Sequence, residues 1–408
     1  MPNVLFAVPF AMDASLRFVR AAVALPGVRL AVVTQEPPER FPDDLRAKLA
    51  GHYRVRDAMD AEELVQGARH LAGVLGGRVD RFIGILEPLQ VPLAEARERL
   101  GLPGASVEVA KNFRDKARMK TILREHGLPC AKHHLATEPA GVLQFAGRVG
   151  YPLVVKPPAG AGARNTFRVN SRSELEQALR TMPPRREAPV LFEEFIQGEE
   201  YSFDSVTLGG RHLFHSISRY APAPLEVLQN PWIQWAVYLP RRIDDPKFAP
   251  IFTAGPRALE ALGLDTGLTH MEWFRRPDGT IAISEVAVRP PGAQFTTLLS
   301  YAHDFDFYSG WARLVIFDEF TPPERRFSAG AAYVRAQGSG GRIVAIRGLE
   351  EAQRELGDLV VEAKLPQTGQ APSGTYEGEG YVVVRHPETE VVERALKRLV
   401  ELIRVDLG

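Results

Sequence analysis

The chain has 408 residues, which is long for a single hydrophobic core and predicts two or three domains. Apolar residues make up 45% of it and charged residues 25%, as in an ordinary globular protein. Fifty basic residues balance fifty acidic ones, so the net charge gives no reason to expect a nucleic acid or a membrane surface as partner. The single cysteine, Cys130, excludes disulfides within this sequence and is typical of a cytoplasmic protein.

The first 110 residues alternate short apolar runs with helical patterns, which predicts a small parallel α/β domain. The expected strands are 4–8, 30–34, 53–56 and 81–86, and the expected helices are 14–24, 61–75 and 93–100. No window is apolar over the roughly 18 residues that a membrane span needs. Glu87 follows the fourth strand, where it can face a ligand crevice, although taken alone it is more typical of a solvated loop.

The rest of the chain predicts a mixed domain over 111–326 and a small α+β domain over 327–408. A helix over 111–125 is expected to end at a Gly and Pro stop, and an aromatic-rich insertion is expected over 216–250. The other expected strands are 151–157, 166–170, 190–194, 200–208, 330–337, 341–347 and 380–386, and the other expected helices are 173–181, 251–262, 306–315 and 388–403.

A lysine followed by a loop of small residues is the first candidate for a binding site. Lys156 ends an apolar strand, and Ala159-Gly160-Ala161-Gly162-Ala163 follows closely. Small residues let backbone N–H groups approach phosphate oxygens, and the lysine adds positive charge. The spacing matches neither a Walker loop nor GxGxxG, so a plain flexible turn remains the alternative for this segment read alone.

An acidic segment follows the apolar strand 190–194 and is the second candidate. Glu193, Glu194 and Ile196 precede a turn at Gly198, and Glu200 comes next. An adenine needs one carbonyl and one N–H from an extended hinge, and a nearby carboxylate can accept hydrogen bonds from ribose hydroxyls. A charged hairpin turn gives the same pattern, so this segment alone leaves both interpretations open.

Two alternating apolar runs flank Pro277-Asp278-Gly279 and predict a β-hairpin over 267–292. A two-residue loop would place Glu272 opposite Glu285, with Cβ atoms roughly 5 Å apart. Facing carboxylates repel each other, and Mg²⁺ carrying a substrate phosphate would reverse the sign of the interaction. A three-residue loop with a glycine bulge would instead shift the register by one residue and put the two acids on opposite faces.

The order of these features resembles the ATP-grasp superfamily over about residues 111–326. The flanking regions also resemble those of ATP-grasp carboxylate–amine ligases and, more distantly, biotin carboxylases. The resemblance implies an ATP-grasp fold with an N-terminal parallel α/β domain, a lid over about 117–190, a catalytic sheet over about 191–326 and a small C-terminal α+β domain. It also implies ATP and one or two Mg²⁺ ions as cofactors, with Mn²⁺ as a possible substitute.

Matched by position, the resemblance implies a role for each residue of the candidate site. Lys116 and Lys156 would bind the nucleotide phosphates, and Glu272 and Glu285 would hold the metal. Arg289 would contact the transferred phosphate, since a planar guanidinium suits phosphate oxygens. The remaining implied nucleotide contacts are the lid loop with Gly160, Ala161 and Gly162, the adenine hinge with Glu193, Glu194 and Ile196, and Glu200 at the ribose.

One departure from the family pattern concerns the metal. The family motif is Glu-x-Asn-x-Arg. In this sequence Ala287 stands where the family has the asparagine, and alanine carries no ligand atom. His270 lies opposite Ala287 in the predicted register, but imidazole is a poor ligand for Mg²⁺, which favours a hydrogen-bonding or substrate-facing role. Trp232 and Trp235 in the insertion are expected to pack in the core, or else to shape the acceptor pocket.

The resemblance implies a cytoplasmic ligase that joins a small-molecule carboxylate to an amine through an acyl phosphate and releases ADP and phosphate. A homodimer is the commonest oligomeric state and is the expectation here. Two alternatives stay open. A biotin carboxylase-like, bicarbonate-activating enzyme is disfavoured because the chain is short and has no biotin-carrier segment. A non-catalytic nucleotide-binding regulatory module is favoured only by Ala287.

Overall fold

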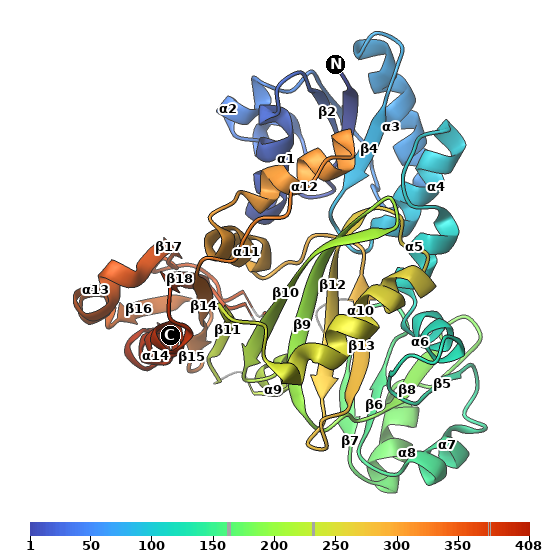
Figure 1. Cartoon of the computed structure of the whole chain (residues 1–408), viewed down its shortest axis with the longest axis vertical. Coiled ribbons are helices and arrows are strands. Elements are labelled where there is room, and N and C mark those ends of the chain that lie inside the picture. The colour runs from blue at the N-terminus through green and yellow to red at the C-terminus, as the bar shows by residue number, and fades with distance from the viewer. Residues whose placement is uncertain (161–164, 231–232, 374, 376) are drawn as a thin grey trace.

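The computed structural model covers the whole chain and describes residues 1–160, 165–230, 233–373, 375 and 377–408. A large twisted sheet occupies the middle of the molecule (Figure 1). The N-terminal α/β region, a small lid-like sheet with two helices, and the C-terminal region surround it. Within the described residues, no helix combines the length and the apolar character that crossing a membrane requires.

The N-terminal region is a parallel sheet in the order β3-β2-β1-β4, as predicted. Alternate residues of β1 face different cores: Val4 and Phe6 pack with α1 and α12, while Leu5 and Ala7 pack with α3 and α4. Its elements are β1 (Asn3–Ala7), α1 (Asp13–Ala24), β2 (Arg29–Thr34), η1 (Pro38–Arg40), α2 (Asp43–Arg46), β3 (Gly51–Arg54), α3 (Ala61–Val74), β4 (Arg81–Gly84) and α4 (Gln90–Leu100).

The prediction of a single helix over 111–125 is wrong, because the helix is interrupted at Asp115. Helix α5 (Val107–Arg114) ends there, and α6 (Lys116–Glu125) begins at the next residue. Asp115 has an extended backbone, and its carboxylate accepts hydrogen bonds from the N–H groups of Ala117 and Arg118, which makes it an N-cap. The break places Lys116 in the first turn of α6, where it faces the pocket described below.

The lid-like region is an antiparallel sheet in the order β5-β8-β6-β7. Helices α7 and α8 cover one side of it and share a core with it that includes Phe145, Leu153 and Leu175. Its elements are β5 (His133–Ala136), α7 (Val142–Val149), β6 (Leu153–Lys156), β7 (Phe167–Val169), α8 (Arg172–Thr181) and β8 (Val190–Glu194).

The central sheet has eight strands in the order β13-β12-β9-β10-β11-β14-β18-β17. The expectation of an insertion over 216–250 is wrong for β11, which is an inner strand between β10 and β14. All five of its residues are buried, since Trp235 and Val237 face one core and Ala236 and Tyr238 the other. The elements up to the hairpin are β9 (Glu199–Leu208), β10 (Arg211–Ala221), α9 (Pro224–Gln229), β11 (Trp235–Leu239), η2 (Pro246–Phe248), α10 (Ala249–Ala261), β12 (Gly267–Arg275) and β13 (Ile281–Ala287).

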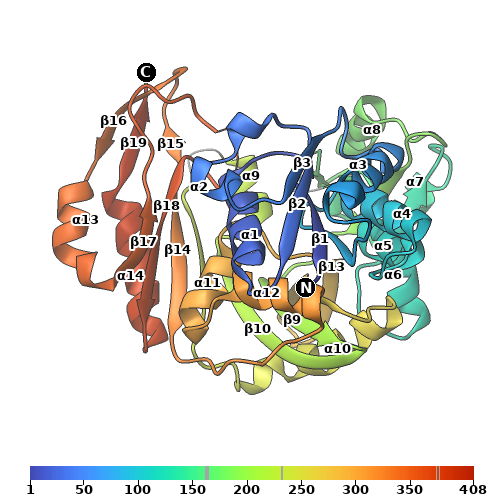
Figure 2. The same cartoon turned by 90° about the horizontal axis from the view of Figure 1, so that it is seen from above.

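The C-terminal region continues the central sheet and adds the small sheet β15-β19-β16 (Figure 2). The large sheet thus runs across residue 326, and the domain boundary expected there stays a prediction. The remaining elements are α11 (Phe295–His303), α12 (Phe307–Phe317), β14 (Ser328–Val334), β15 (Ala336–Gln337), β16 (Ile343–Arg347), α13 (Leu349–Leu356), η3 (Gly357–Leu359), β17 (Val360–Lys364), β18 (Gly380–His386), α14 (Thr389–Leu402) and β19 (Arg404–Leu407).

Candidate active site

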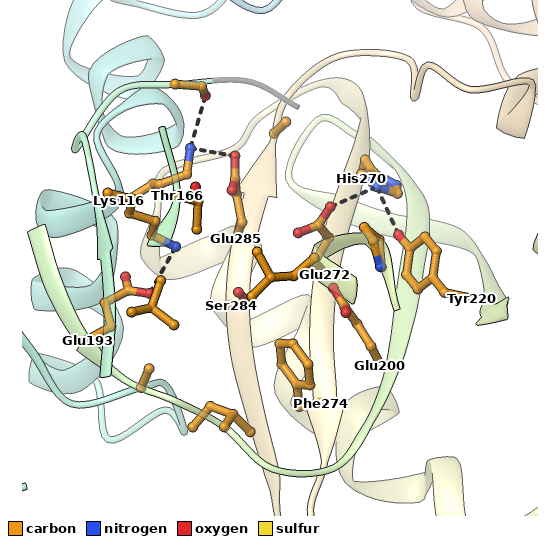
Figure 3. Close-up of a pocket in the computed structure, with 18 of the residues that line it drawn as sticks. Lys116, Thr166, Glu193, Glu200, Tyr220, His270, Glu272, Phe274, Ser284 and Glu285 are labelled. Atoms are coloured by element: carbon orange, nitrogen blue, oxygen red, sulfur yellow. Dashed lines mark hydrogen bonds and ion pairs between the residues drawn. The ribbon is translucent and has the colours of Figure 1, made fainter. Parts of the chain in front are cut away.

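A pocket lies where the lid-like sheet meets the central sheet. Figure 3 shows side chains from β6, β8, β9, β10, β12 and β13 that point into it, together with Lys116 at the start of α6. Most of the predicted site residues line this one pocket: Glu87, Lys116, Lys156, Gly160, Glu193, Glu194, Ile196, Glu200, Trp235, His270, Glu272, Glu285 and Arg289. Ala161, Gly162 and Trp232 lie outside the described residues.

The hairpin of β12 and β13 combines features of both expected registers. Its loop has three residues, 277–279, with Gly279 at φ 85°, and Trp273 pairs with Ile283. A bulge that includes Ser284 then shifts the register, so that Glu272 pairs with Glu285 and His270 with Ala287. The predicted pairing of the two glutamates is therefore confirmed, although the loop next to it is the longer one.

Lys116 holds one of the two facing glutamates. Its Nζ lies 2.8 Å from Glu285 Oε1 and also donates a hydrogen bond to the carbonyl oxygen of Gly160 at 3.0 Å. Burial would raise the pKa of Glu285, but Lys116 and Lys156 lower it below the usual value. Burial and the nearby Glu285 charge raise the pKa of Glu272. Lys116 therefore compensates Glu285 directly, whereas the nearest cationic partner of Glu272 is His270, whose Nε2 lies 3.8 Å from Glu272 Oε1.

Lys120, which the sequence analysis missed, forms a buried charge cluster with Glu193 and Lys156. Glu193 lies 3.0 Å from Lys120 Nζ and 2.9 Å from Lys156 Nζ. Lys120 is fully buried, and it also donates a hydrogen bond to the carbonyl of Ser284 in the hairpin bulge. Its position one turn after Lys116 on α6 was the available signal, since both side chains then lie on the same helix face. The cluster ties the lid-like sheet to the bulge.

The charge cluster predicts how stability depends on pH. Burial would raise the pKa of Glu193, but Lys120 and Lys156 lower it to about 2. In the unfolded chain this carboxyl has its ordinary pKa, so the unfolded state binds the proton more readily. We expect the contribution of Glu193 to be complete above about pH 4.5 and to be lost as the pH falls towards 2. Urea unfolding of the wild type and of Glu193→Gln across this range measures it, and parallel pH curves for the two proteins would contradict it.

The acidic segment after β8 borders the same pocket as an extended chain. Phe195 and Ile196 line it, and Glu194 is fixed by an ion pair with Arg276 at 2.8 Å. The turn at Gly198 presses against the hairpin, where an added Cβ would lie 2.3 Å from the Arg275 carbonyl oxygen. Burial and the neighbouring Glu272 raise the pKa of Glu200 well above the usual value. The adenine and ribose assignments remain predictions.

Glu87 is buried, which makes the interpretation as a solvated loop acid wrong. Its carboxylate accepts hydrogen bonds from Arg289 Nη2 at 2.7 Å and Nε at 3.2 Å, and from Arg114 Nη1 at 3.2 Å. Arg114, which the sequence analysis also missed, donates a further hydrogen bond to the Gly160 carbonyl at 3.0 Å. Glu87 therefore orients the guanidinium of Arg289 from the N-terminal region.

His270 is held from behind by a buried polar network. Its Nδ1 lies 2.6 Å from an oxygen of Asp204, whose other oxygen accepts hydrogen bonds from Ser202 and Ser218. Burial would lower the pKa of His270, but Asp204 raises it above the usual value. Nε2 faces the pocket, 3.4 Å from the hydroxyl of Tyr220. These contacts agree with a hydrogen-bonding role for the histidine.

The donor set sets limits on which metal fits. Among the described residues, no group of three or more histidine, cysteine, aspartate or glutamate side chains is placed to hold an ion. Glu272 and Glu285 offer carboxylate oxygens only, which suits a hard cation that takes its other ligands from water and phosphate. Two facing carboxylates, each of which raises the energy of the other's charged form, fit a divalent cation such as Mg²⁺.

The comparisons with known proteins agree with this geometry. Residues 121–303 match the model of the ATP-grasp domain. The L-arginine-specific L-amino acid ligase of Bacillus subtilis is 24% identical over 291 residues, 70% of each chain. The alanine–anticapsin ligase of B. subtilis is 27% identical over 57% of this chain and 52% of its own length. The crystal structure of an L-amino acid ligase from B. licheniformis superposes with a TM-score of 0.82 at 22% identity, covering 100% of this chain and 99% of that one.

The chain therefore contains an ATP-grasp domain over residues 121–303, as the sequence predicted. The relatives and the solved structure that it resembles are named as ligases that act on amino acids.

Proposed function

We propose that the protein is an ATP-dependent ligase that joins the carboxyl group of one amino acid to the amine of another, so that the products are a dipeptide, ADP and phosphate. The observation that carries the proposal is one pocket that contains two lysines, facing glutamates and an oriented arginine, with additional room beside them. The similarity of the chain to two ligases of amino acids supports this substrate class. The single cysteine supports a cytoplasmic location, and we expect a homodimer.

The nucleotide would lie between the two sheets. Lys116 and Lys156 would donate hydrogen bonds to the phosphates while Glu285 and Glu193 orient them, and the backbone around Glu194 and Ile196 would contact the adenine. Glu200 would accept hydrogen bonds from the ribose. We further propose that residues 117–190 act as a lid that excludes water once both substrates are bound, because an acyl phosphate is rapidly hydrolysed in water.

Glu272 and Glu285 would hold one Mg²⁺, or Mn²⁺ in its place. When bound, the ion neutralises charge on the phosphates as they are transferred. Arg289, oriented by Glu87, would contact the same phosphoryl group and then the carbonyl oxygen of the acyl phosphate. Lys156, at the end of β6 in the lid-like sheet, would contact the transferred phosphoryl group from the opposite side.

Two group transfers complete the proposed reaction. A carboxylate oxygen of the first amino acid attacks the γ-phosphorus, and the bond to ADP breaks. The amine nitrogen of the second amino acid then attacks the acyl carbon, phosphate leaves with the electron pair of the broken C–O bond, and the nitrogen loses a proton. The site contributes positioning and charge neutralisation, for which lysines and an arginine are suited.

A phosphate-release screen tests the proposal. Purified protein is supplied with ATP, Mg²⁺ and pairs of amino acids, and the products are identified by mass spectrometry. Release that requires both amino acids and yields a dipeptide supports it. Release driven by bicarbonate would indicate a carboxylase-like activity, and tight ATP binding without turnover on any pool would indicate a regulatory module.

Restoring the absent ligand atom gives a direct prediction about the metal. Ala287 lines the pocket opposite His270, so Ala287→Asn would add an amide oxygen beside Glu285. We expect the half-saturating Mg²⁺ concentration for turnover to fall several-fold, because the ion gains a protein ligand. Ala287→Leu, which adds similar volume without an oxygen, is the matched control. Equal Mg²⁺ dependence of the wild type and the asparagine variant would contradict the expectation.

A further inference from the structure

The pocket extends past Glu272 and Arg289 into a part that the nucleotide machinery does not use. We name this part the side-chain chamber and define it by Tyr220, Pro224, Leu225, Trp235, Ala293 and Phe295. These residues come from β10, α9, β11, the loop before α11, and α11 itself. Figure 3 shows Tyr220 and His270 on the side of Glu272 away from Lys116.

The walls of the chamber are carbon surfaces. None of its six residues is charged, and the indole N–H of Trp235 is directed away to the carbonyl of Pro222 at 3.1 Å. The hydroxyl of Tyr220 lies at the His270 side, 3.4 Å from Nε2. The polar groups therefore concentrate at the mouth, and the interior offers aromatic faces and aliphatic groups.

The aromatic walls fix one another in place. Tyr220 and Trp235 are nearly parallel, with ring centroids 6.2 Å apart, and Trp235 stacks on Tyr333 at 4.5 Å. Phe295 meets Tyr220 edge-on at 5.8 Å. Such mutual packing gives a preformed cavity that does not have to be ordered when a ligand binds.

Two charged groups at the mouth are already paired, and Glu272 beside them is assigned to the metal in the proposed function. Arg289 and Glu87 pair with each other at 2.7 Å, and His270 pairs with Asp204 at 2.6 Å. A lysine or arginine side chain in the chamber would lose its hydration and would find no carboxylate among the six residues that define it. An apolar side chain would instead exchange water for carbon contacts.

We propose that the side-chain chamber binds the side chain of one of the two amino acids, and that this amino acid is apolar or aromatic. The inference rests on the proposed function, because it names a substrate class for the same site. It sets the protein apart from the L-arginine-specific ligase that it resembles, whose name specifies a basic substrate. The reactive carboxyl or amino group would lie at the mouth, between Arg289 and His270.

The first test is the phosphate-release assay with all pairs of the standard amino acids. We expect kcat/KM to fall about tenfold or more for each methylene removed along the series leucine, valine and alanine at one position. Lysine, arginine and glutamate should be poor at that position. Release with charged amino acids as the best substrates at both positions would overturn the inference and leave the ligase intact. No release with any pair would overturn both proposals.

A charge placed in the chamber provides the second test. Leu225 is half-buried on α9, so Leu225→Glu should fold, and it puts a carboxylate on the chamber wall. We expect this variant to lose activity with leucine and to gain about tenfold with lysine or arginine. Leu225→Gln is the matched control; it should lose activity with leucine and gain none with the basic amino acids. Unchanged selectivity in the glutamate variant would overturn the inference.

Hydroxylamine shows which substrate the chamber holds. It replaces the amine and converts the acyl phosphate to a hydroxamate, so only the amino acid that donates its carboxyl group is needed. An apolar preference that persists in this assay assigns the chamber to the carboxyl donor. A preference seen only in dipeptide formation assigns it to the amine acceptor. If neither assay shows a preference for apolar amino acids, the proposal is overturned.

Discussion

Glu285→Gln is expected to lower kcat for phosphate release by about 10²- to 10³-fold, the loss typical when one preorganised electrostatic contact to a transition state is removed. The substitution conserves shape and removes the charge that faces Glu272. It also removes the ion-pair partner of Lys116, 2.8 Å away, and with it the anchor that orients this lysine at the pocket. The metal and one phosphate-binding group would both be disturbed. Steady-state turnover with saturating ATP and Mg²⁺ measures the effect.

The matched control is Glu199→Gln, which removes another glutamate from the central sheet. Glu199 is exposed and pairs with Arg219 at 3.0 Å, and a surface ion pair of this kind contributes little. We expect turnover of this variant within about twofold of the wild type. If Glu285→Gln behaves like this control, the metal assignment is wrong. Binding of a fluorescent ATP analogue to both variants separates a loss of nucleotide affinity from a loss of chemistry.

Lys120→Met is expected to lower the free energy of unfolding by about 3–5 kcal/mol, the cost typical of breaking a buried ion pair from one side. Lys120 is fully buried, and its removal leaves Glu193 with Lys156 as its remaining partner in the cluster. It also leaves the Ser284 carbonyl without this donor, so the bulge that sets the Glu272–Glu285 register loses a support. Urea denaturation followed by tryptophan fluorescence gives the free energy of unfolding.

The double variant Lys120→Met with Glu193→Gln distinguishes a charge effect from a packing effect. If the cost comes from an uncompensated carboxylate, neutralising Glu193 should restore part of the lost stability. Additive losses in the double variant would contradict the charge cluster. We also expect the double variant to weaken ATP binding, because Lys156 then loses the carboxylate of Glu193, which lies 2.9 Å from its Nζ and orients it.

The sequence predicted a set of candidate site residues that line one pocket, because they follow one another along the chain in a fixed order. Lys156 ends a strand before small residues, and Glu272 and Glu285 lie on adjacent strands joined by a short loop. Local sequence patterns therefore predict which strands carry these residues, but they do not predict the register between the strands. The loop proved to have three residues, and the bulge at Ser284 restores the pairing; a one-residue bulge leaves no mark in an alternating pattern of seven residues.

The sequence by itself determined the ATP-grasp domain, and it predicted the class of reaction and the order of the candidate site residues. Only the tertiary structure decided which charges meet. Arg289 and Glu87 are 202 residues apart, and Lys120 reaches a carbonyl 164 residues away, so no periodicity could pair them. The side-chain chamber depends likewise on β11, whose burial on both faces removes the alternation that identifies a strand in a sequence. Long-range packing between layers, which spacing along the chain does not record, sets the partners of these groups.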